Sequence, residues 1–490
     1  MKRPSITRGA LLLTLGQILA RVGDLLIAVL LVRILRPEEW ATVALVLSVY
    51  TAAIGFGGIG LPEGMLFFLG RLPKAQHRRF VAQTMLLLSA TGALAAAIIL
   101  AVGPLLRGSP FDLPSLLPWL ALAVLLEVPT LGAPQLLLAE ERVSGSAAWN
   151  AAAALLRFAC VTGPILLGQG VAGALHGLVG YAAIRLVGFL VLVARLTPRG
   201  ALRPAWASIR EQATYTAPLG LSILAASLNA SVGKWIVAGW DAAHLGAFAV
   251  AATQVPIVPM LAASTGAVLA TRMVHSFHHG LLDQARAYWL AAAARMTLVV
   301  AGITLAFVLG APELIRLLFG GKYPDAVLPF QLCTLVLLHR IADHGGTLRA
   351  AGDTTTLWRA SFLVLAANAL LGIAATRLAG MLGMAAATLA ASLLAWIYLL
   401  SRIARVIGTT LSSVIPWGLY ARALLLASAA AVAAAWVSVW TPESAVLRLA
   451  LKWTLFGGLY LAGIRGFGLS RALPAIPDDH AGFRSEKVPA

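Results

Sequence analysis

The stretch "LTLGQILARVGDLLIAVLL" runs from Leu13 to Leu31 and is apolar enough to lie inside a bilayer. Gln17, Arg21 and Asp24 interrupt it at positions i, i+4 and i+7, so on a helix these three side chains share one face. A charged side chain at the centre of a bilayer costs about 2.5–3.5 kcal/mol on insertion scales. The stretch therefore predicts a membrane-spanning helix whose polar face is turned away from lipid.

The whole chain shares this apolar character. Of its 490 residues, 60% are hydrophobic and 11% are charged, and apolar runs long enough to span a membrane recur from end to end. The formal net charge is +18, but the basic residues lie in short loops between these runs, as topology determinants do, so we exclude a nucleic-acid partner. Cys160 and Cys333 lie inside apolar runs and indicate no disulfide framework. The composition predicts an all-α integral membrane protein.

An internal repeat organises the fourteen predicted transmembrane helices. "ILRPEEWATVALVLS" (Ile34–Ser48) aligns with "GWDAAHLGAFAVAAT" (Gly239–Thr253), and the stretch Gly168–Leu196 aligns with Leu378–Val406 at nearly the same offset. Six helices in each half, repeated directly, imply two bundles related by an axis along the membrane normal. Rocking two such bundles exposes the cleft between them to either side, which is the architecture of a transporter.

The repeat and the loop charges give a domain plan. We expect an N-terminal six-helix lobe at 1–200, a C-terminal six-helix lobe at 201–410, two additional helices at 411–468 and a cytoplasmic tail at 469–490. Lys and Arg are concentrated in the loops of one side, which places both termini in the cytoplasm by the positive-inside rule. The tenth span is expected over residues 326–349.

Charged residues recur inside the predicted helices, with basic ones in excess. The candidates for holding an anionic ligand are Gln17, Arg21, Arg157, Arg185 and Arg340. Their charges would be costly against lipid, so they are expected to face protein or the cleft. Guanidinium groups bind phosphate with two parallel hydrogen bonds, which makes a phosphate group the expected ligand.

Three acidic residues in the same helices are candidates for carrying a coupling proton or sodium ion: Asp24, Glu127 and Asp343. We expect Asp24 to hold Arg21 while no ligand is bound. Arg340 and Asp343 are three residues apart and are expected to pair on one helix face. For every intramembrane arginine a structural ion pair or a position near the interface remains the alternative.

The stretch "IGFGGIGLPEG" (Ile54–Gly64) interrupts the second predicted span at 40–69. Membrane helices tolerate Gly and Pro where neighbouring groups or water satisfy the freed backbone. A hinge is expected at Gly57, Gly58, Gly60 and Pro62, with a packing kink as the equal alternative. No phosphate-binding loop, nucleotide fingerprint or nucleophile–base arrangement occurs, so we expect neither an enzyme nor a cofactor or metal site.

Four longer stretches resemble the polysaccharide-type flippases of the multidrug/oligosaccharidyl-lipid/polysaccharide exporter superfamily. They are "RILRPEEWATVALVLSVYTAAIGFGGIGLPEGMLFFLGR" (33–71), "YTAPLGLSILAASLNASVGKWIVAGWDAAHLGAFAVAAT" (215–253), "PELIRLLFGGKYPDAV" (312–327) and "LRAAGDTTTLWRASFLVLAANALLGIAATRLAGMLGMAAATLA" (348–390). Each is a soft pattern of Gly, Pro and apolar residues, but their order and spacing together are more specific.

The resemblance implies alternating access and translocation of an undecaprenyl-pyrophosphate-linked oligosaccharide across the bacterial inner membrane, for O-antigen, capsule or exopolysaccharide synthesis. It implies that basic cavity residues hold the pyrophosphate, and Arg21 lies at the position of such a residue. The partners that it implies are the lipid-linked oligosaccharide, membrane lipid, a polysaccharide polymerase and glycosyltransferases. The family often has an acidic residue in its seventh helix, where this chain has Gly233 followed by Lys234, so a coupling role there is not transferred.

Three other functions stay open at this point. A lipid II flippase of the same superfamily fits the span count equally well. A cation-coupled drug exporter fits the fold, although the basic surplus argues against cationic cargo. A non-transporting scaffold that recruits enzymes of polysaccharide synthesis would use the buried charges only for stability. Neighbouring genes for glycosyltransferases or for peptidoglycan synthesis would separate the first two functions.

Overall fold

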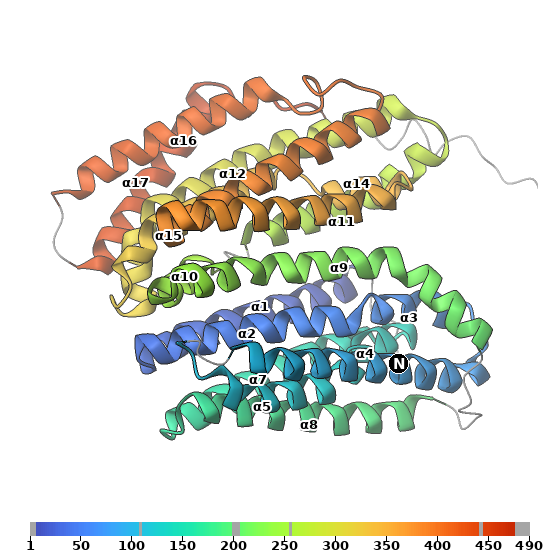
Figure 1. Cartoon of the computed structure of the whole chain (residues 1–490). Coiled ribbons are helices and arrows are strands. Elements are labelled where there is room, and N and C mark those ends of the chain that lie inside the picture. Colours follow the sequence, from blue (N-terminus) through green and yellow to red (C-terminus); the bar gives the residue numbers. More distant parts are fainter. Residues whose placement is uncertain (1–5, 107–109, 198–205, 254–256, 441–443, 476–490) are drawn as a thin grey trace, which may run out of the picture. The chain divides into compact units, whose positions relative to one another are not determined.

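The computed structural model describes residues 6–106, 110–197, 206–253, 257–440 and 444–475, and these ranges consist of helices joined by turns (Figure 1). Eleven of the described helical segments are long and apolar enough to cross a membrane. The prediction of an all-α, multi-span membrane protein is confirmed. The N-terminal five residues and most of the predicted tail, residues 476–490, lie outside the described ranges.

Three further helices could bring this number to the predicted fourteen, which stays a prediction. Helix α15 (Thr354–Val406) is two helices that meet at Ala379 and Gly380, where φ is −140° and 57°. Helices α1 (Ile6–Ile34) and α11 (Ile257–His278) have 29 and 22 residues. At about 1.5 Å per residue, both are long enough for a hydrocarbon core about 30 Å thick.

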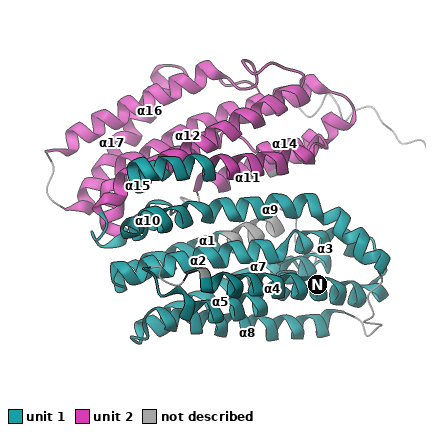
Figure 2. Cartoon of the chain, in the orientation of Figure 1, with its two compact units in different colours: residues 1–253, 318–323, 368–384 teal, residues 254–317, 324–367, 385–490 magenta. Residues whose placement is uncertain are grey.

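The chain forms two compact units, coloured separately in Figure 2. Unit 1 comprises 1–253, 318–323 and 368–384, and unit 2 comprises 254–317, 324–367 and 385–490. The predicted lobes divide at residue 200, whereas unit 1 also includes the next two helices of the chain. The units are defined by their internal contacts and the lobes by the sequence repeat, so the lobe boundary stays a prediction.

Unit 1 is a succession of neighbouring helices. In turn, α1 contacts α7, α7 contacts α8, α8 contacts α5, α5 contacts α4, α4 contacts α2, and α2 contacts α9. The bounds are α2 Pro37–Gly58, α3 Leu61–Leu69, α4 Lys74–Val102, α5 Leu113–Glu127, α6 Ala133–Ala139, α7 Val143–Leu166, α8 Gly170–Leu196, α9 Trp206–Trp240 and α10 Leu245–Ala251. Short 3-10 turns extend α4 (η1, Gly103–Leu106) and α5 (η2, Val128–Thr130) and precede α10 (η3, Ala242–His244).

The interruption predicted within Ile54–Gly64 is confirmed, and it lies at Ile59 and Gly60. Both have left-handed backbone conformations, with φ of 34° and 73°. Here the chain touches α9 backbone to backbone: a Cβ on Gly220 would lie 2.2 Å from the Ile59 carbonyl oxygen, and one on Gly60 would lie 2.8 Å from the Gly220 nitrogen. Only glycine permits so close an approach, so the break positions α2 and α3 on α9. The hinge role stays a prediction.

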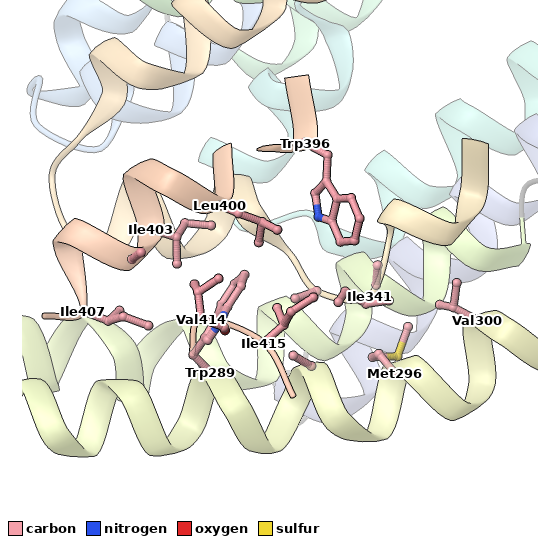
Figure 3. Close-up of a cluster of buried hydrophobic side chains, with 14 of the residues drawn as sticks. Trp289, Met296, Val300, Ile341, Trp396, Leu400, Ile403, Ile407, Val414 and Ile415 are labelled. Atoms are coloured by element: carbon pink, nitrogen blue, oxygen red, sulfur yellow. The ribbon is translucent and has the colours of Figure 1, made fainter. Parts of the chain in front are cut away.

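Unit 2 contains the remaining helices and its own apolar core. Besides α11, it contains α12 Leu282–Phe319 up to residue 317 and α15 except for residues 368–384. The other elements of unit 2 are α13 Val327–Leu335, α14 His344–Ala350, α16 Trp417–Ser438, α17 Ala445–Gly466 and the 3-10 turns η4 Pro324–Ala326 and η5 Val336–His339. Figure 3 shows the core, where Trp289 of α12 meets Leu400 and Ile403 of α15. The Trp289 indole donates to the carbonyl oxygen of Val414 over 2.6 Å.

The two C-terminal helices expected at 411–468 are present as α16 and α17. Lys452 of α17 lies 2.8 and 3.0 Å from the carboxylate oxygens of Glu313 in α12, and both side chains are largely buried. Trp453, the next residue of α17, and Tyr460, about two turns further along, donate to carbonyl oxygens of α12 at 2.9 and 2.8 Å. These polar contacts and the surrounding apolar cluster dock the pair on α12.

The tenth span predicted at 326–349 is present as the apolar segment Pro324–Ala350, but the helix inside it is interrupted. Helix α13 ends at Leu335, a 3-10 turn follows, residues 340–343 are not helical, and α14 begins at His344. The cause is local, because Asp343 caps α14 by accepting a hydrogen bond from the Gly346 nitrogen at 2.9 Å. Asp is among the residues most favoured at that position, so a new helix begins there.

Asp353 begins α15 in the same way, just outside the predicted span. Its carboxylate accepts hydrogen bonds from the Thr356 backbone and hydroxyl and lies 3.0 Å from Arg402. Partial burial alone would raise the pKa of Asp353, but the hydrogen bonds from Thr356 and Arg402 outweigh it and hold that pKa below its usual value. The start of α15 is therefore fixed by an ionised carboxylate.

Candidate functional site

Five helices of unit 1 bring six polar side chains into one connected network. They are Asp24 of α1, Tyr50 of α2, Glu127 of α5, Arg157 of α7, and Tyr181 and Arg185 of α8. Sequence reasoning selected the four charged members and missed the two tyrosines. Tyr181 had a signal, because it stands four residues before Arg185 on one helix face. Tyr50 had none, since its role depends on contacts with other helices.

Glu127 is the centre of the network. Its Oε1 lies 2.6 Å from Arg185 Nη1, and its Oε2 accepts a hydrogen bond from the Tyr50 hydroxyl. Arg185 Nη1 also donates to the Tyr181 hydroxyl at 2.8 Å, and that hydroxyl lies 3.5 Å from Glu127 Oε1. Glu127 is only 4% exposed. A carboxylate this deeply buried requires a compensating charge, which Arg185 supplies.

A helix break places Glu127 at this point. It is the last residue of α5, and the 3-10 turn η2 follows with Pro129 inside it. The turn fits between α2 and α4 because Gly57 and Gly92 face Val128, where added Cβ atoms would lie 2.7 and 3.0 Å from its side chain. The Thr130 hydroxyl donates to the Glu127 carbonyl at 2.7 Å and satisfies an acceptor at the helix end.

Arg157 extends the network toward the surface of unit 1. Its Nη1 lies 3.0 Å from Asp24 Oδ1, and its guanidinium carbon lies 5.2 Å from the centre of the Tyr50 ring. The second contact is a cation–π interaction. The Asp24 side chain is 53% exposed and that of Arg157 is 24% exposed. The network thus runs from a buried carboxylate to an accessible one.

The expected pairing of Asp24 with Arg21 is wrong. Helix α1 packs on α7 through two glycines one heptad apart: a Cβ on Gly16 would lie 3.1 Å from Ala147, and one on Gly23 would lie 3.6 Å from Ala154. Asp24 follows Gly23 directly, so its side chain reaches α7 and Arg157.

Arg21 itself is exposed on α1 and has no ion pair or hydrogen bond to any residue that the structure describes. The backbone of Gln17 lies one turn earlier in α1, and its side chain lies outside the described part of the structure. Among the described residues, Arg21 therefore has no compensating carboxylate, although Asp24 lies on the same helix.

Two donors in the network are unused. The Nε atoms of Arg157 and Arg185 are buried and have no hydrogen-bond partner among the described residues. A buried polar atom is normally paired, so each unpaired N–H marks a position that a further acceptor would stabilise. An anionic oxygen is the natural acceptor for a guanidinium.

The remaining predicted residues form a separate group in unit 2, and the expected Arg340–Asp343 pair is wrong. Asp343 caps α14 and lies 4.0 Å from Arg349 instead. The residues from Arg340 to Asp343 are not helical, so the three-residue spacing does not bring their side chains together. Asp343 lines a small pocket with Thr265, Trp289 and Thr347. Among the described residues, no three His, Cys, Asp or Glu side chains are grouped to hold a metal ion.

The long apolar helices define the class of the protein, a polytopic membrane protein. The structure is similar to lipid II flippase MurJ in an inward closed conformation, with a TM-score of 0.73 and 12% identity over 94% of this chain and 100% of that chain. An inward-facing multidrug resistance MATE family transporter gives a TM-score of 0.60 and 14% identity over 80% of this chain and 96% of the other. A MOP superfamily transporter from Pyrococcus furiosus gives 0.57 and 14% identity over 82% and 96%.

A comparison of the sequence with family models identifies the family of the protein. Residues 6–277, more than half of the chain, match the family described as polysaccharide biosynthesis protein. The chain belongs to this family, which confirms the resemblance found in the sequence. A search of curated proteins gives no match.

Proposed function

We propose that the protein is a flippase that moves an undecaprenyl-pyrophosphate-linked oligosaccharide across the bacterial inner membrane by alternating access. Family membership supports a role in polysaccharide synthesis, and the MOP fold supports transport. The observation that carries the proposal is Arg21, a guanidinium on a membrane helix that no described residue pairs with. Such a group favours an anionic ligand at depth, and a pyrophosphate offers several oxygens for bidentate binding.

The structure suggests different roles for the predicted basic residues. Arg21 is the proposed primary contact, with Gln17 one turn away on the same helix. Arg157 is the proposed second contact, because a free Nε donor remains although Asp24 holds its Nη1. Arg185 is committed to Glu127 and serves to hold that carboxylate. Arg340 stays a candidate of unit 2.

The same contacts separate the coupling candidates. Both carboxylate oxygens of Glu127 are already engaged, Oε2 by Tyr50 and Oε1 by Arg185, and the side chain is buried, so a coupling ion has poor access to it. Asp24 has one charged partner and is more exposed. We therefore assign proton or sodium coupling to Asp24, which would release Arg157 for the ligand when it is neutralised. Asp343 remains the candidate carboxylate of unit 2.

A lipid II flippase is the second candidate function, favoured by the TM-score of 0.73 against MurJ. Both substrates are pyrophosphate-linked lipids, so the cation at Arg21 suits either. A drug exporter would need acidic residues in excess, and a scaffold would need no uncompensated cation. Location in the inner membrane with both termini cytoplasmic belongs to the proposal.

The direct test is a flipping assay with the purified full-length protein in proteoliposomes. We expect a fluorescent undecaprenyl-pyrophosphate oligosaccharide to become accessible to a membrane-impermeant quencher, and lipid II to move more slowly. Equal rates would favour the second candidate. If neither lipid moves faster than in protein-free liposomes, the flippase proposal is wrong.

A further inference from the structure

A basic side chain near the end of each of the helices α1 and α12 donates hydrogen bonds to backbone carbonyl groups at the end of the other helix. Lys322, which follows α12, donates from Nζ to the carbonyl oxygens of Val32, Arg33 and Leu35 at 3.2, 2.8 and 3.0 Å. In return, Arg33 donates from Nε to the carbonyl oxygen of Leu318 at 2.8 Å. Lys322 thus binds carbonyl groups at the C-terminal end of α1, and Arg33 binds one at the C-terminal end of α12.

This exchange fits the chemistry of helix ends. The last carbonyl groups of a helix have no intrahelical partner and carry a partial negative charge, so a cation there is stabilising. An ammonium group has three N–H donors, and Lys322 uses them on three carbonyls. Gly320 and Gly321 turn the chain so that Lys322 reaches back, with φ of 70° and 73°, values that glycine adopts readily.

Neighbouring contacts seat the same six residues, 318–323, against unit 1. The Trp40 indole of α2 donates to the Gly246 carbonyl of α10 at 3.1 Å. A Cβ on Gly246 would lie 3.3 Å from both the Trp40 and the Tyr323 rings, and Tyr323 is buried. Tyr323, the last residue of the segment, therefore packs beside Gly246 of α10, in addition to the bonds of Lys322 and Arg33.

The chain path makes these bonds mechanically significant. Residues 318–323 belong to unit 1, whereas the residues before them, to 317, and after them, from 324, belong to unit 2 (Figure 2). Chain continuity therefore links the end of α1 to helices of unit 2 through this short segment. Any movement that draws the end of α12 away from the end of α1 has to break the bonds of Lys322 and Arg33.

We propose that Arg33, Lys322 and the carbonyl groups that they bind form a latch, which holds the ends of α1 and α12 together in one conformation and opens in another. Its part in transport rests on the proposed alternating access, whereas its opening does not. The latch lies at the side with few basic loop residues, the periplasmic side in the predicted topology.

The test measures opening by cysteine accessibility in the purified full-length protein in nanodiscs, where both membrane faces are open to the reagent. Cys160 and Cys333 are replaced by serine, and Leu35→Cys reports on the latch, because Leu35 is 3% exposed. We expect Lys322→Ala to increase the rate of maleimide labelling by about tenfold or more, because one charge-assisted hydrogen bond is worth about tenfold and Lys322 makes three. Lys322→Arg keeps donors and should give a smaller increase.

The matched control is Arg316→Ala. Arg316 is an exposed basic residue near the end of α12 with no bond to any described residue, so its loss removes the same charge without opening the latch. Equal labelling rates in Lys322→Ala and Arg316→Ala would overturn the proposal. A second reporter, Leu120→Cys in the core of α5, detects unfolding. If Lys322→Ala also increases labelling of Leu120→Cys, the variant Arg33→Gln is used in place of Lys322→Ala. Its labelling rate at Leu35→Cys is then compared with that of Arg316→Ala.

The flipping assay keeps the two proposals apart. Faster labelling of Leu35→Cys together with a changed flipping rate supports both. If Lys322→Ala increases labelling of Leu35→Cys but neither the wild type nor the variant moves lipid, the result supports the latch and contradicts the flippase. Unchanged labelling in a protein that flips lipid contradicts only the latch.

Discussion

Arg185 Nη1 lies 2.6 Å from Glu127 Oε1, and the two residues come from helices α8 and α5, 58 positions apart in the chain. Their side chains are 13% and 6% exposed. The pair therefore neutralises two charges inside the helix bundle that carries the candidate site. Its main effect is on the stability of unit 1, and that effect can be measured independently of transport.

Arg185→Met should destabilise the protein strongly. It leaves Glu127 buried without its cation, and breaking a buried pair from one side costs about 3–5 kcal/mol. Glu127→Gln should cost less, because the amide still accepts from Tyr50 while Arg185 retains the Tyr181 hydroxyl. The unfolding midpoint in detergent measures both. A midpoint for Arg185→Met equal to that of the wild type would show that the pair is not a stability element.

Arg21→Ala should abolish surface polysaccharide while the protein level stays near normal. Because Asp24 is paired with Arg157 and not with Arg21, this substitution leaves no carboxylate newly unpaired. Arg21→Lys should be partly active, since a point charge lacks the bidentate fork. Immunoblots of polysaccharide and of the protein give the two readouts, with Arg316→Ala as the charge-matched control. Normal polysaccharide in a stable Arg21→Ala strain would rule out the pyrophosphate contact.

Gly220→Ala should destabilise the α2–α9 seam by about 1–3 kcal/mol, the usual cost of overpacking. Its added methyl would meet the Ile59 carbonyl oxygen. Gly239→Ala is the control in the same helix, because nothing lies within 4 Å of its added Cβ. Thermal unfolding compares the two variants. Similar midpoints would mean that the seam relaxes, and the packing explanation of the break would then fail.

Reporter fusions should place both termini on one side of the membrane. Fusions after Pro198 and after Ala490 are expected to read cytoplasmic, and one after Gly320 periplasmic, because the basic loops lie on the first side. Alkaline phosphatase and green fluorescent protein activities give complementary signals. A periplasmic reading after Ala490 would contradict the count of fourteen spans.

The sequence predicted the break in the second span because its cause is local. Gly and Pro within Ile54–Gly64 disfavour a continuous helix wherever they stand. The break before α14 has an equally local cause, the cap at Asp343, yet the apolar run around it favoured one helix. Hydropathy locates a span reliably, but it does not report whether the helix inside that span is continuous.

The sequence by itself determined the membrane character, the helices and the residues on each helix face, because periodicity and hydropathy are properties of short segments. Only the tertiary structure decided which charges meet. Asp24 shares a face with Arg21 at three residues' distance, yet it pairs with Arg157, 133 residues away. The cause is the close glycine seam between α1 and α7, and a contact between two helices depends on packing that neither helix encodes alone.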